Sequence, residues 1–254
     1  MIPKIIHYCW FGPKQIPEDC KKLIESWKIY CPDWDFKLWN EESFNITSHP
    51  FTQSAYEAKK YAFVSDYVRA WALNKFGGVY LDTDVELKAS IDIFLKSQAF
   101  TGFEIQGYPF TALWGSEANH KLTQKVLSYY DNRIYHINNE TNTTSVSQIL
   151  IEDFGIDPDK NCYQVGKSDS YTIDIYPSTH FCLDLPPNFA THHFYGSWLE
   201  TQHKTAKQYL NEQYQINQMM PHSNFINSKN YLRALAKTLT LKSLFFLIRQ
   251  FIKR

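Results

Sequence analysis

The chain has 254 residues, of which 44% are hydrophobic and 17% aromatic, and this is enough apolar material for the core of one α/β catalytic domain. Its 26 acidic residues balance 26 basic ones, but every acidic residue lies at or before Glu212 and seven basic residues follow it, so residues 1–212 carry a formal charge of −7. This asymmetry argues against a nucleic-acid-binding catalytic face and predicts an anionic partner for the basic C-terminal stretch.

The first half of the chain predicts a β-α-β order. Residues 54–76 carry apolar side chains near helical spacing and run into Gly77-Gly78, where the end of a helix favours glycine. The expected elements are strands at 4–8, 34–39 and 79–81 and helices at 18–30, near 40, and at 54–76.

The second half continues the alternation, with strands expected at 99–103, 110–114, 172–176 and 190–193 and helices at 120–132 and 146–154. The fold class predicted is α/β, a mixed and mainly parallel sheet flanked by helices. Ligands of such sheets bind beyond the carboxyl ends of strands, and Trp10, Asp82 and Asp84 all follow such ends. The sequence therefore predicts one crevice at that edge.

The five cysteines form no C-x-x-C pair, and an odd number cannot all be bridged within one chain. We therefore expect reduced, mostly buried thiols. The sequence shows no basic-then-apolar leader and no uninterrupted apolar span of about 18 residues, so a cytoplasmic location is expected. The N-x-T strings at Asn45, Asn139 and Asn142 are then expected to be chance matches.

Asp82-Thr83-Asp84 follows an apolar strand. Because side chains at i and i+2 of a strand point the same way, the two carboxylates are expected to converge on one ligand. Two close carboxylates need a cation, and an oxygen-only site suits Mg²⁺ or Mn²⁺, which also bind substrate phosphates. The alternative for an isolated Asp-x-Asp is a solvated turn.

Asp66 and Arg69 lie three residues apart and share a helix face. A surface ion pair is one interpretation. Because the surrounding helix is so apolar, we expect it to be largely buried, and a buried charged pair needs partners beyond itself.

Three ordered strings resemble glycosyltransferase family 32, a family of DXD-containing sugar transferases that includes mannosyltransferases and bacterial polysaccharide-synthesis enzymes. They are PKIIHYCWFG at 3–12, SDYVR at 65–69 with GGVYLDTD at 77–84, and HHFYGSW at 192–198. The donor site of the clostridial glucosylating toxins is similar. The resemblance implies a GT-A-type nucleotide-diphospho-sugar transferase fold.

The resemblance also implies a nucleotide site. Trp10 would stack on the base and Tyr80 would lie beside the nucleotide, with packing in the core as the alternative for both. Ser197 and Trp198 resemble the donors that hold the diphosphate and the leaving oxygen, and an exposed loop tryptophan is the alternative for Trp198.

Catalytic and metal-binding roles follow from the same resemblance. It implies that Asp66 and Arg69 grip the donor sugar, with a structural ion pair as the alternative. Asp84 would bind Mn²⁺ or Mg²⁺ directly, and Asp82 would reach the ribose, the sugar or a metal-bound water. His192 is the predicted third metal ligand.

His192 is preferred because it lies six residues before Trp198. His193 remains the alternative ligand, since alternation along a strand lets only one of the two adjacent rings point inward.

The function expected from the resemblance is a retaining, metal-dependent transfer of a hexose or N-acetylhexosamine. The donor would be a nucleoside-diphosphate sugar and the acceptor a glycan or glycolipid, in bacterial surface polysaccharide or lipooligosaccharide synthesis. One alternative is a catalytically silent partner or scaffold of another transferase. A HAD-type phosphohydrolase fits poorly, because Glu86 stands where that pattern has Thr or Val.

The C-terminal stretch is a separate prediction. Residues 229–254 alternate apolar and basic side chains without an acid, as interfacial amphipathic helices do, and polybasic attraction adds about 1 kcal/mol per residue at an anionic membrane. We expect a catalytic domain at 1–212, a linker at 213–226 and a helical tail at 227–254, placed peripherally at the inner face of the plasma membrane. A helix packed on the domain, or a dimerisation helix, is the alternative.

Overall fold

The structure is a computed structural model that describes residues 1–136 and 140–195, and apart from Leu185–Pro187 these residues belong to one compact unit. Its helices are α1 (Glu18–Tyr30), α2 (Pro50–Glu57), α3 (Tyr61–Phe76), α4 (Lys121–Tyr130), α5 (Asn142–Phe154) and α6 (Ser178–Phe181), with 3-10 turns η1 (Ile46–Ser48) and η2 (Asp92–Lys96). Its strands are β1 (Ile5–Cys9), β2 (Asp35–Trp39), β3 (Gly78–Leu81), β4 (Val85–Leu87), β5 (Ala99–Gly102), β6 (Leu113–Ser116), β7 (Gln164–Ser168), β8 (Tyr171–Tyr176) and β9 (Ala190–His192).

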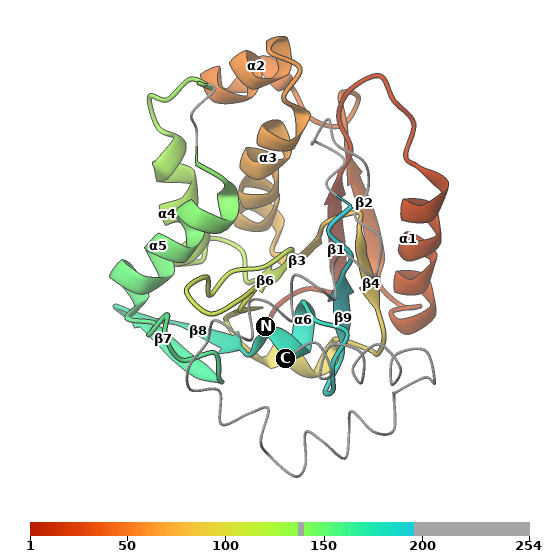
Figure 1. Ribbon diagram of the computed structural model, residues 1–254. Coiled ribbons are helices and arrows are strands. Elements are labelled where there is room, and N and C mark those ends of the chain that lie inside the picture. Colours follow the sequence, from red (N-terminus) through yellow and green to blue (C-terminus); the bar gives the residue numbers. More distant parts are fainter. Residues whose placement is uncertain (137–139, 196–254) are drawn as a thin grey trace, which may run out of the picture. The chain divides into compact units, whose positions relative to one another are not determined.

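Seven strands form one sheet in the order β2-β1-β3-β6-β5-β8-β7 (Figure 1). β2, β1, β3, β5 and β8 run in one direction, whereas β6 and β7 run against them. The predicted mixed, mainly parallel sheet is therefore confirmed. β4 and β9 form a separate two-stranded ribbon.

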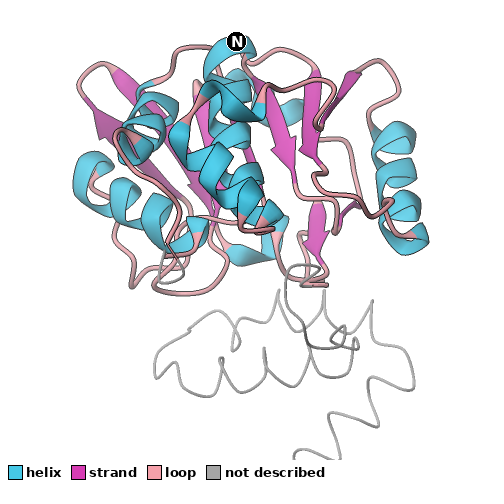
Figure 2. Ribbon diagram, turned by 90° about the horizontal axis from the view of Figure 1, so that it is seen from above, coloured by secondary structure: helices cyan, strands magenta, loops and turns pink. Residues whose placement is uncertain are grey.

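Helices cover both faces of the sheet (Figures 1 and 2). Along β3, Tyr80 joins the core cluster that includes the inner faces of α3, α4 and α5, whereas Val79 and Leu81 join the cluster that includes Ile24 and Trp27 of α1. This alternation is the period of two that a strand imposes. The helical layers flanking the sheet, predicted from the sequence, are confirmed.

The predicted helix over 54–76 is wrong in one respect, because it is two helices. α2 ends at Glu57 and α3 begins at Tyr61, and between them Lys59 has a φ of 57°, in the left-handed region. A residue in that conformation interrupts the helical hydrogen-bond ladder. α3 itself ends at Phe76 before Gly77, as the glycine pair indicates.

The glycine pair also brings β3 close to β1. Gly78 has a φ of 109°, and a Cβ at this position would lie 2.6 Å from the carbonyl oxygen of Ile5. The ring of His7 is fully buried beside the glycine pair. Its Nε2 lies 2.8 Å from the Gly77 carbonyl oxygen, and its Nδ1 accepts from the Trp39 indole N–H at 3.1 Å. Burial lowers the pKa of His7 to about 4, so this ring is neutral at pH 7.

Other boundaries shift or were not predicted. The strand expected at 110–114 is β6, Leu113–Ser116, and the short strands β4 and β7 were not expected. The predicted linker and tail, residues 213–254, lie outside the described residues. Among the described residues, no helix has the length and apolar character needed to cross a membrane.

Candidate active site

Asp82-Thr83-Asp84 forms the turn that joins β3 to β4. The Val85 N–H donates to the Asp82 carbonyl at 3.0 Å, so the strand is already over when the carboxylates appear. Strand alternation is therefore not what brings them together, contrary to the prediction. They converge through the turn, and one oxygen of each lies within 4.8 Å of the other and of a ring nitrogen of His192.

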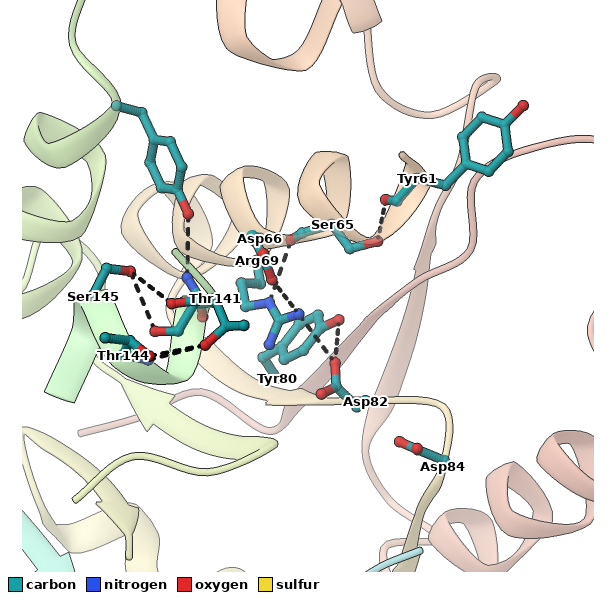
Figure 3. A network of polar contacts seen from close by, with 12 residues as sticks. Tyr61, Ser65, Asp66, Arg69, Tyr80, Asp82, Asp84, Thr141, Thr144 and Ser145 are labelled. Carbon is teal, nitrogen blue, oxygen red and sulfur yellow. Dashed lines mark hydrogen bonds and ion pairs between the residues drawn. The ribbon is translucent and has the colours of Figure 1, made fainter. Parts of the chain in front are cut away.

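The Asp82 carboxylate belongs to a fixed network with α3 (Figure 3). Arg69 Nη2 lies 2.7 Å from Asp66 Oδ1 and 3.3 Å from Asp82 Oδ1. The Tyr80 hydroxyl donates to the same Asp82 oxygen at 3.0 Å, and its ring lies 4.7 Å beneath the guanidinium carbon of Arg69. The structure thus brings together four of the predicted site residues.

This network is buried, which excludes the interpretation of Asp66 and Arg69 as a surface ion pair. Asp66 and Arg69 are each 8% exposed. Burial raises the pKa of Asp66 to about 6, although the Arg69 charge works against that rise. One guanidinium faces two carboxylates, and this supplies the further partner that a buried pair needs.

The Asp84 carboxylate has no drawn contact with that network (Figure 3) and instead contacts the β9 end of the chain. Its Oδ1 lies 3.4 Å from His192 Nε2, and its Oδ2 accepts the Tyr195 main-chain N–H at 3.0 Å. Burial would lower the pKa of His192, but the Asp84 charge, the contact with the Asp84 carboxylate and the nearby Cys182 together outweigh burial and hold it well above its ordinary value. Burial likewise works against the Asp84 charge, yet His192 and the Tyr195 N–H bring the pKa of Asp84 below its ordinary value.

The ribbon register decides which histidine faces the cluster. Val85 pairs with His192, and the next ring, His193, lies with Nε2 2.8 Å from Glu86 Oε2. Glu86 also binds Lys88 at 2.8 Å, so His193 belongs to a separate polar group. The structure places His192, and not the alternative His193, beside the two aspartates.

The nucleotide residues predicted from the sequence have mixed outcomes. Trp10 follows β1, the parallel neighbour of β3, so it lies at the same sheet edge as Asp82, and its indole N–H donates to the Lys14 carbonyl at 2.6 Å. Base stacking by Trp10 stays a prediction. Tyr80 is 1% exposed, which supports its alternative as a packing residue whose hydroxyl orients Asp82. Ser197 and Trp198 lie outside the described residues.

The sequence did not predict a polar group at the start of α5. Thr141, Thr144 and Ser145 lie across from the Arg69 network (Figure 3), and Asn142, 6% exposed, donates from Nδ2 to the Tyr130 hydroxyl at 3.2 Å. Burial raises the pKa of Tyr130, and the Asp66 charge adds to this rise, so the hydroxyl stays protonated near that carboxylate. The string T-x-x-T at 141–144 could have indicated the start of a helix. It could not have indicated that this helix end lies across from α3, because that depends on the tertiary fold.

The comparisons with known proteins address this region directly. Residues 17–101 match the family described as "Glycosyltransferase sugar-binding region containing DXD motif". This segment holds Asp66, Arg69 and both aspartates of the turn. The chain contains a DXD-type glycosyltransferase sugar-binding region. The predicted family resemblance is therefore confirmed for this region.

Curated relatives match the chain over shares of their length that differ widely. Inositol phosphoceramide mannosyltransferase 3 of Schizosaccharomyces pombe is 36% identical over 39% of this chain and 29% of its own length. An uncharacterised glycosyltransferase of Acanthamoeba polyphaga mimivirus is 24% identical over 78% of this chain and 84% of its own length. The chain thus spans less than a third of the fission-yeast relative.

Solved structures give weaker likenesses. The PaToxG glycosyltransferase is 20% identical, with a TM-score of 0.47 over 59% of this chain and 68% of its own. A glycosyltransferase involved in glycosylation of the major capsid of PBCV-1 is 12% identical, with a TM-score of 0.40 over 70% of this chain and 83% of its own. Likenesses at these scores do not define the site.

Proposed function

We propose that the protein is a divalent-metal-dependent glycosyltransferase. It moves a hexose or N-acetylhexosamine from a nucleoside-diphosphate sugar to a glycan or glycolipid acceptor, with retention of anomeric configuration. The observation that carries the proposal is the convergence of Asp82, Asp84 and His192 beside the buried Asp66–Arg69 pair. All of these residues except His192 lie in the region that matches the DXD-type sugar-binding family.

The three convergent side chains fit a first-row divalent cation. Two carboxylates supply hard oxygen ligands, and one imidazole adds a nitrogen that Mn²⁺ accepts more readily than Mg²⁺. Asp84 and His192 already lie 3.4 Å apart as a charge pair, so loading a cation requires the proton on His192 to leave. We therefore favour Mn²⁺ and expect its binding to release a proton.

Different residues of the chain would then hold the cation and contact the sugar. Asp84 and His192 would hold the cation, which when bound supplies a Lewis acid for the negative charge on the departing diphosphate. Asp66 fixes Arg69, and Arg69 with the Tyr80 hydroxyl fixes Asp82, so the sugar would meet polar groups that need no rearrangement. Such preorganisation favours the transition state over the bound substrate.

The relatives support a choice of donor and acceptor to try first. The fission-yeast relative is named an inositol phosphoceramide mannosyltransferase, and that name gives mannose as the sugar and a ceramide lipid as the acceptor. Mannose donors and a lipid-linked acceptor are therefore the first candidates for this chain. The predicted role in bacterial surface polysaccharide and the peripheral position at the plasma membrane stay predictions.

The test is release of nucleoside diphosphate from a panel of nucleotide sugars by the full-length protein with Mn²⁺. At least one donor should be turned over, chelation should stop the reaction, and Asp84→Ala should lower the rate by roughly 100-fold or more, the usual loss for a main electrostatic contact. Asp33→Asn, an exposed carboxylate paired with Lys4, is the matched control and should leave the rate unchanged.

Turnover that persists in EDTA, or in Asp84→Ala, would contradict metal dependence. Binding of a nucleotide sugar without turnover, with or without acceptor, would instead support the silent-partner alternative.

A further inference from the structure

The loop at residues 10–14 follows β1 and stands beside the aspartate turn. β1 and β3 are parallel neighbours, and their register puts Trp10 one residue beyond the level of Asp82. The Trp10 ring is partly exposed, and its indole N–H already donates to the Lys14 carbonyl at 2.6 Å. Ligands of such sheets bind beyond the carboxyl ends of the strands. A ligand held at the aspartates would therefore have this loop on its β1 side.

A carboxylate from another segment holds the loop. The Gly12 N–H donates to Glu41 Oε1 at 2.7 Å, and hydrogen bonds to an ionised acceptor are stronger than neutral ones. The neighbouring Phe11, 6% exposed, packs edge-on against Phe44, with 6.4 Å between the ring centroids. Residues 40–44 thus contact the loop through one polar and one apolar side chain.

The segment that carries Glu41 is itself fixed by hydrogen bonds. The Asn40 side-chain oxygen accepts from the main-chain N–H groups of Glu42 and Ser43, at 3.1 Å each. The Phe44 N–H donates to the Asn40 carbonyl at 2.9 Å. Asparagine side chains commonly stabilise turns in this way. The Glu41 carboxylate is exposed, but it is presented to the loop from an internally bonded turn.

Gly12 also packs closely against α3. Its φ is 93°, which favours glycine, and a Cβ at this position would lie 2.5 Å from the ring of Tyr61. The loop therefore lies directly against Tyr61 while its N–H is bound by Glu41. These contacts set the path of the chain two residues after Trp10, before any ligand binds.

We propose that Glu41 is a positioning residue for nucleotide binding, holding the loop at residues 10–14 so that the Trp10 ring meets the nucleoside part of the donor. This inference rests on the proposed function. The ligand class is a nucleoside diphosphate, because an aromatic ring offers a stacking surface for a base and the cation would hold the phosphates. A loop that is ordered in the free protein binds more tightly, since less conformational freedom is lost on binding.

The test measures nucleotide binding by isothermal titration calorimetry of the full-length protein with excess Mn²⁺, using UDP, GDP, ADP, CDP and dTDP as probes. Glu41→Ala should weaken binding of the probe that wild type prefers by about 10-fold, because the loop must then be ordered on binding. Its Mn²⁺ affinity without nucleotide should stay within about twofold of wild type, because the aspartate turn and His192 keep their contacts.

Two matched variants separate the hydrogen bond from the charge. Glu41→Gln keeps an oxygen that accepts from Gly12 and should bind nucleotide within about threefold of wild type. Glu42→Ala removes the neighbouring exposed carboxylate of the same turn and should bind like wild type.

Nucleotide binding by Glu41→Ala within about threefold of wild type would overturn the inference, as would an equal loss in Glu41→Gln. A parallel loss of Mn²⁺ affinity in Glu41→Ala would overturn it too, because the substitution would then have disturbed the whole site. A wild-type protein that binds none of the probes would instead overturn the proposed function, and this inference with it.

Discussion

The two aspartates of the DXD turn are two residues apart, yet they lie in opposite electrostatic settings. Asp82 faces Arg69 and the Tyr80 hydroxyl, groups that hold their protons at all ordinary pH values. Asp84 faces His192, whose proton a metal ion can replace. One carboxylate is therefore neutralised permanently by the fold, and the other is neutralised by an exchangeable partner. This difference supports placing the proposed metal mainly on the Asp84 side.

The strongest test of the Asp82 side removes its cation. Arg69→Met should lower the free energy of unfolding by about 3–5 kcal/mol, because it leaves Asp66 buried without a counter-charge and unpairs Asp82. Urea unfolding measures this. Lys28→Met, which breaks the exposed Glu25–Lys28 pair of α1, should cost about 0–1 kcal/mol. Similar losses in the two variants would show that the buried network does not hold α3 to the turn.

The pH dependence should also distinguish the two sides. Burial raises the pKa of Asp66 to about 6, so the folded protein holds a proton that the unfolded chain has lost above about pH 4. This contribution to stability is present at low pH and is lost as the pH rises to about 6, on the order of 3 kcal/mol for a shift of about two units. Asp84, with its pKa lowered, contributes stability that is lost only as the pH falls.

Carboxyl carbon NMR titration checks these signs. Asp66 should titrate near pH 6, and Asp84 should titrate below its ordinary range. An Asp66 signal that titrates near pH 4 would mean that Arg69 outweighs burial and that the network is more polar than its exposure indicates.

Metal affinity should separate the aspartates from each other. Asp84→Asn should weaken Mn²⁺ binding by roughly 100-fold, about 2.7 kcal/mol, because it removes the carboxylate that lies beside His192 and would hold the cation with it. Asp82→Asn should weaken it by only about 10-fold, because Arg69 already takes part of the Asp82 charge. Isothermal titration calorimetry measures both. Equal losses would remove the distinction drawn between the two carboxylates.

Local signals explain how much of the fold was predictable. Gly77-Gly78 indicated the end of α3 and the start of β3, because few residues other than glycine accept the positive φ values found there. The break between α2 and α3 was not predictable, since Lys59 carries no signal of a left-handed conformation. β4 was missed because a three-residue strand is specified by its distant partner β9 rather than by its own pattern.

The site shows the same division. The motif predicted Asp82, Asp84, Asp66 and Arg69 as neighbours. The structure brings Asp66 and Arg69 of α3 to Asp82, and the turn brings the Asp84 carboxylate close to that of Asp82. The motif could not predict the Tyr195 contact with Asp84, because a main-chain N–H leaves no mark in the sequence.

The choice between the adjacent histidines gives the smallest expected effect and the sharpest local test. His192→Ala should weaken Mn²⁺ binding by about 10-fold, roughly 1.4 kcal/mol, because it removes one of three convergent ligands. His193→Ala should change Mn²⁺ affinity by less than about twofold, because its ring binds Glu86 and that carboxylate keeps Lys88. Calorimetry on the two variants compares rings that differ only in which side of the ribbon they occupy. A larger loss for His193→Ala would mean that the strand register shifts when metal binds. The contacts around Asp84 would then rearrange, instead of only losing the proton of His192.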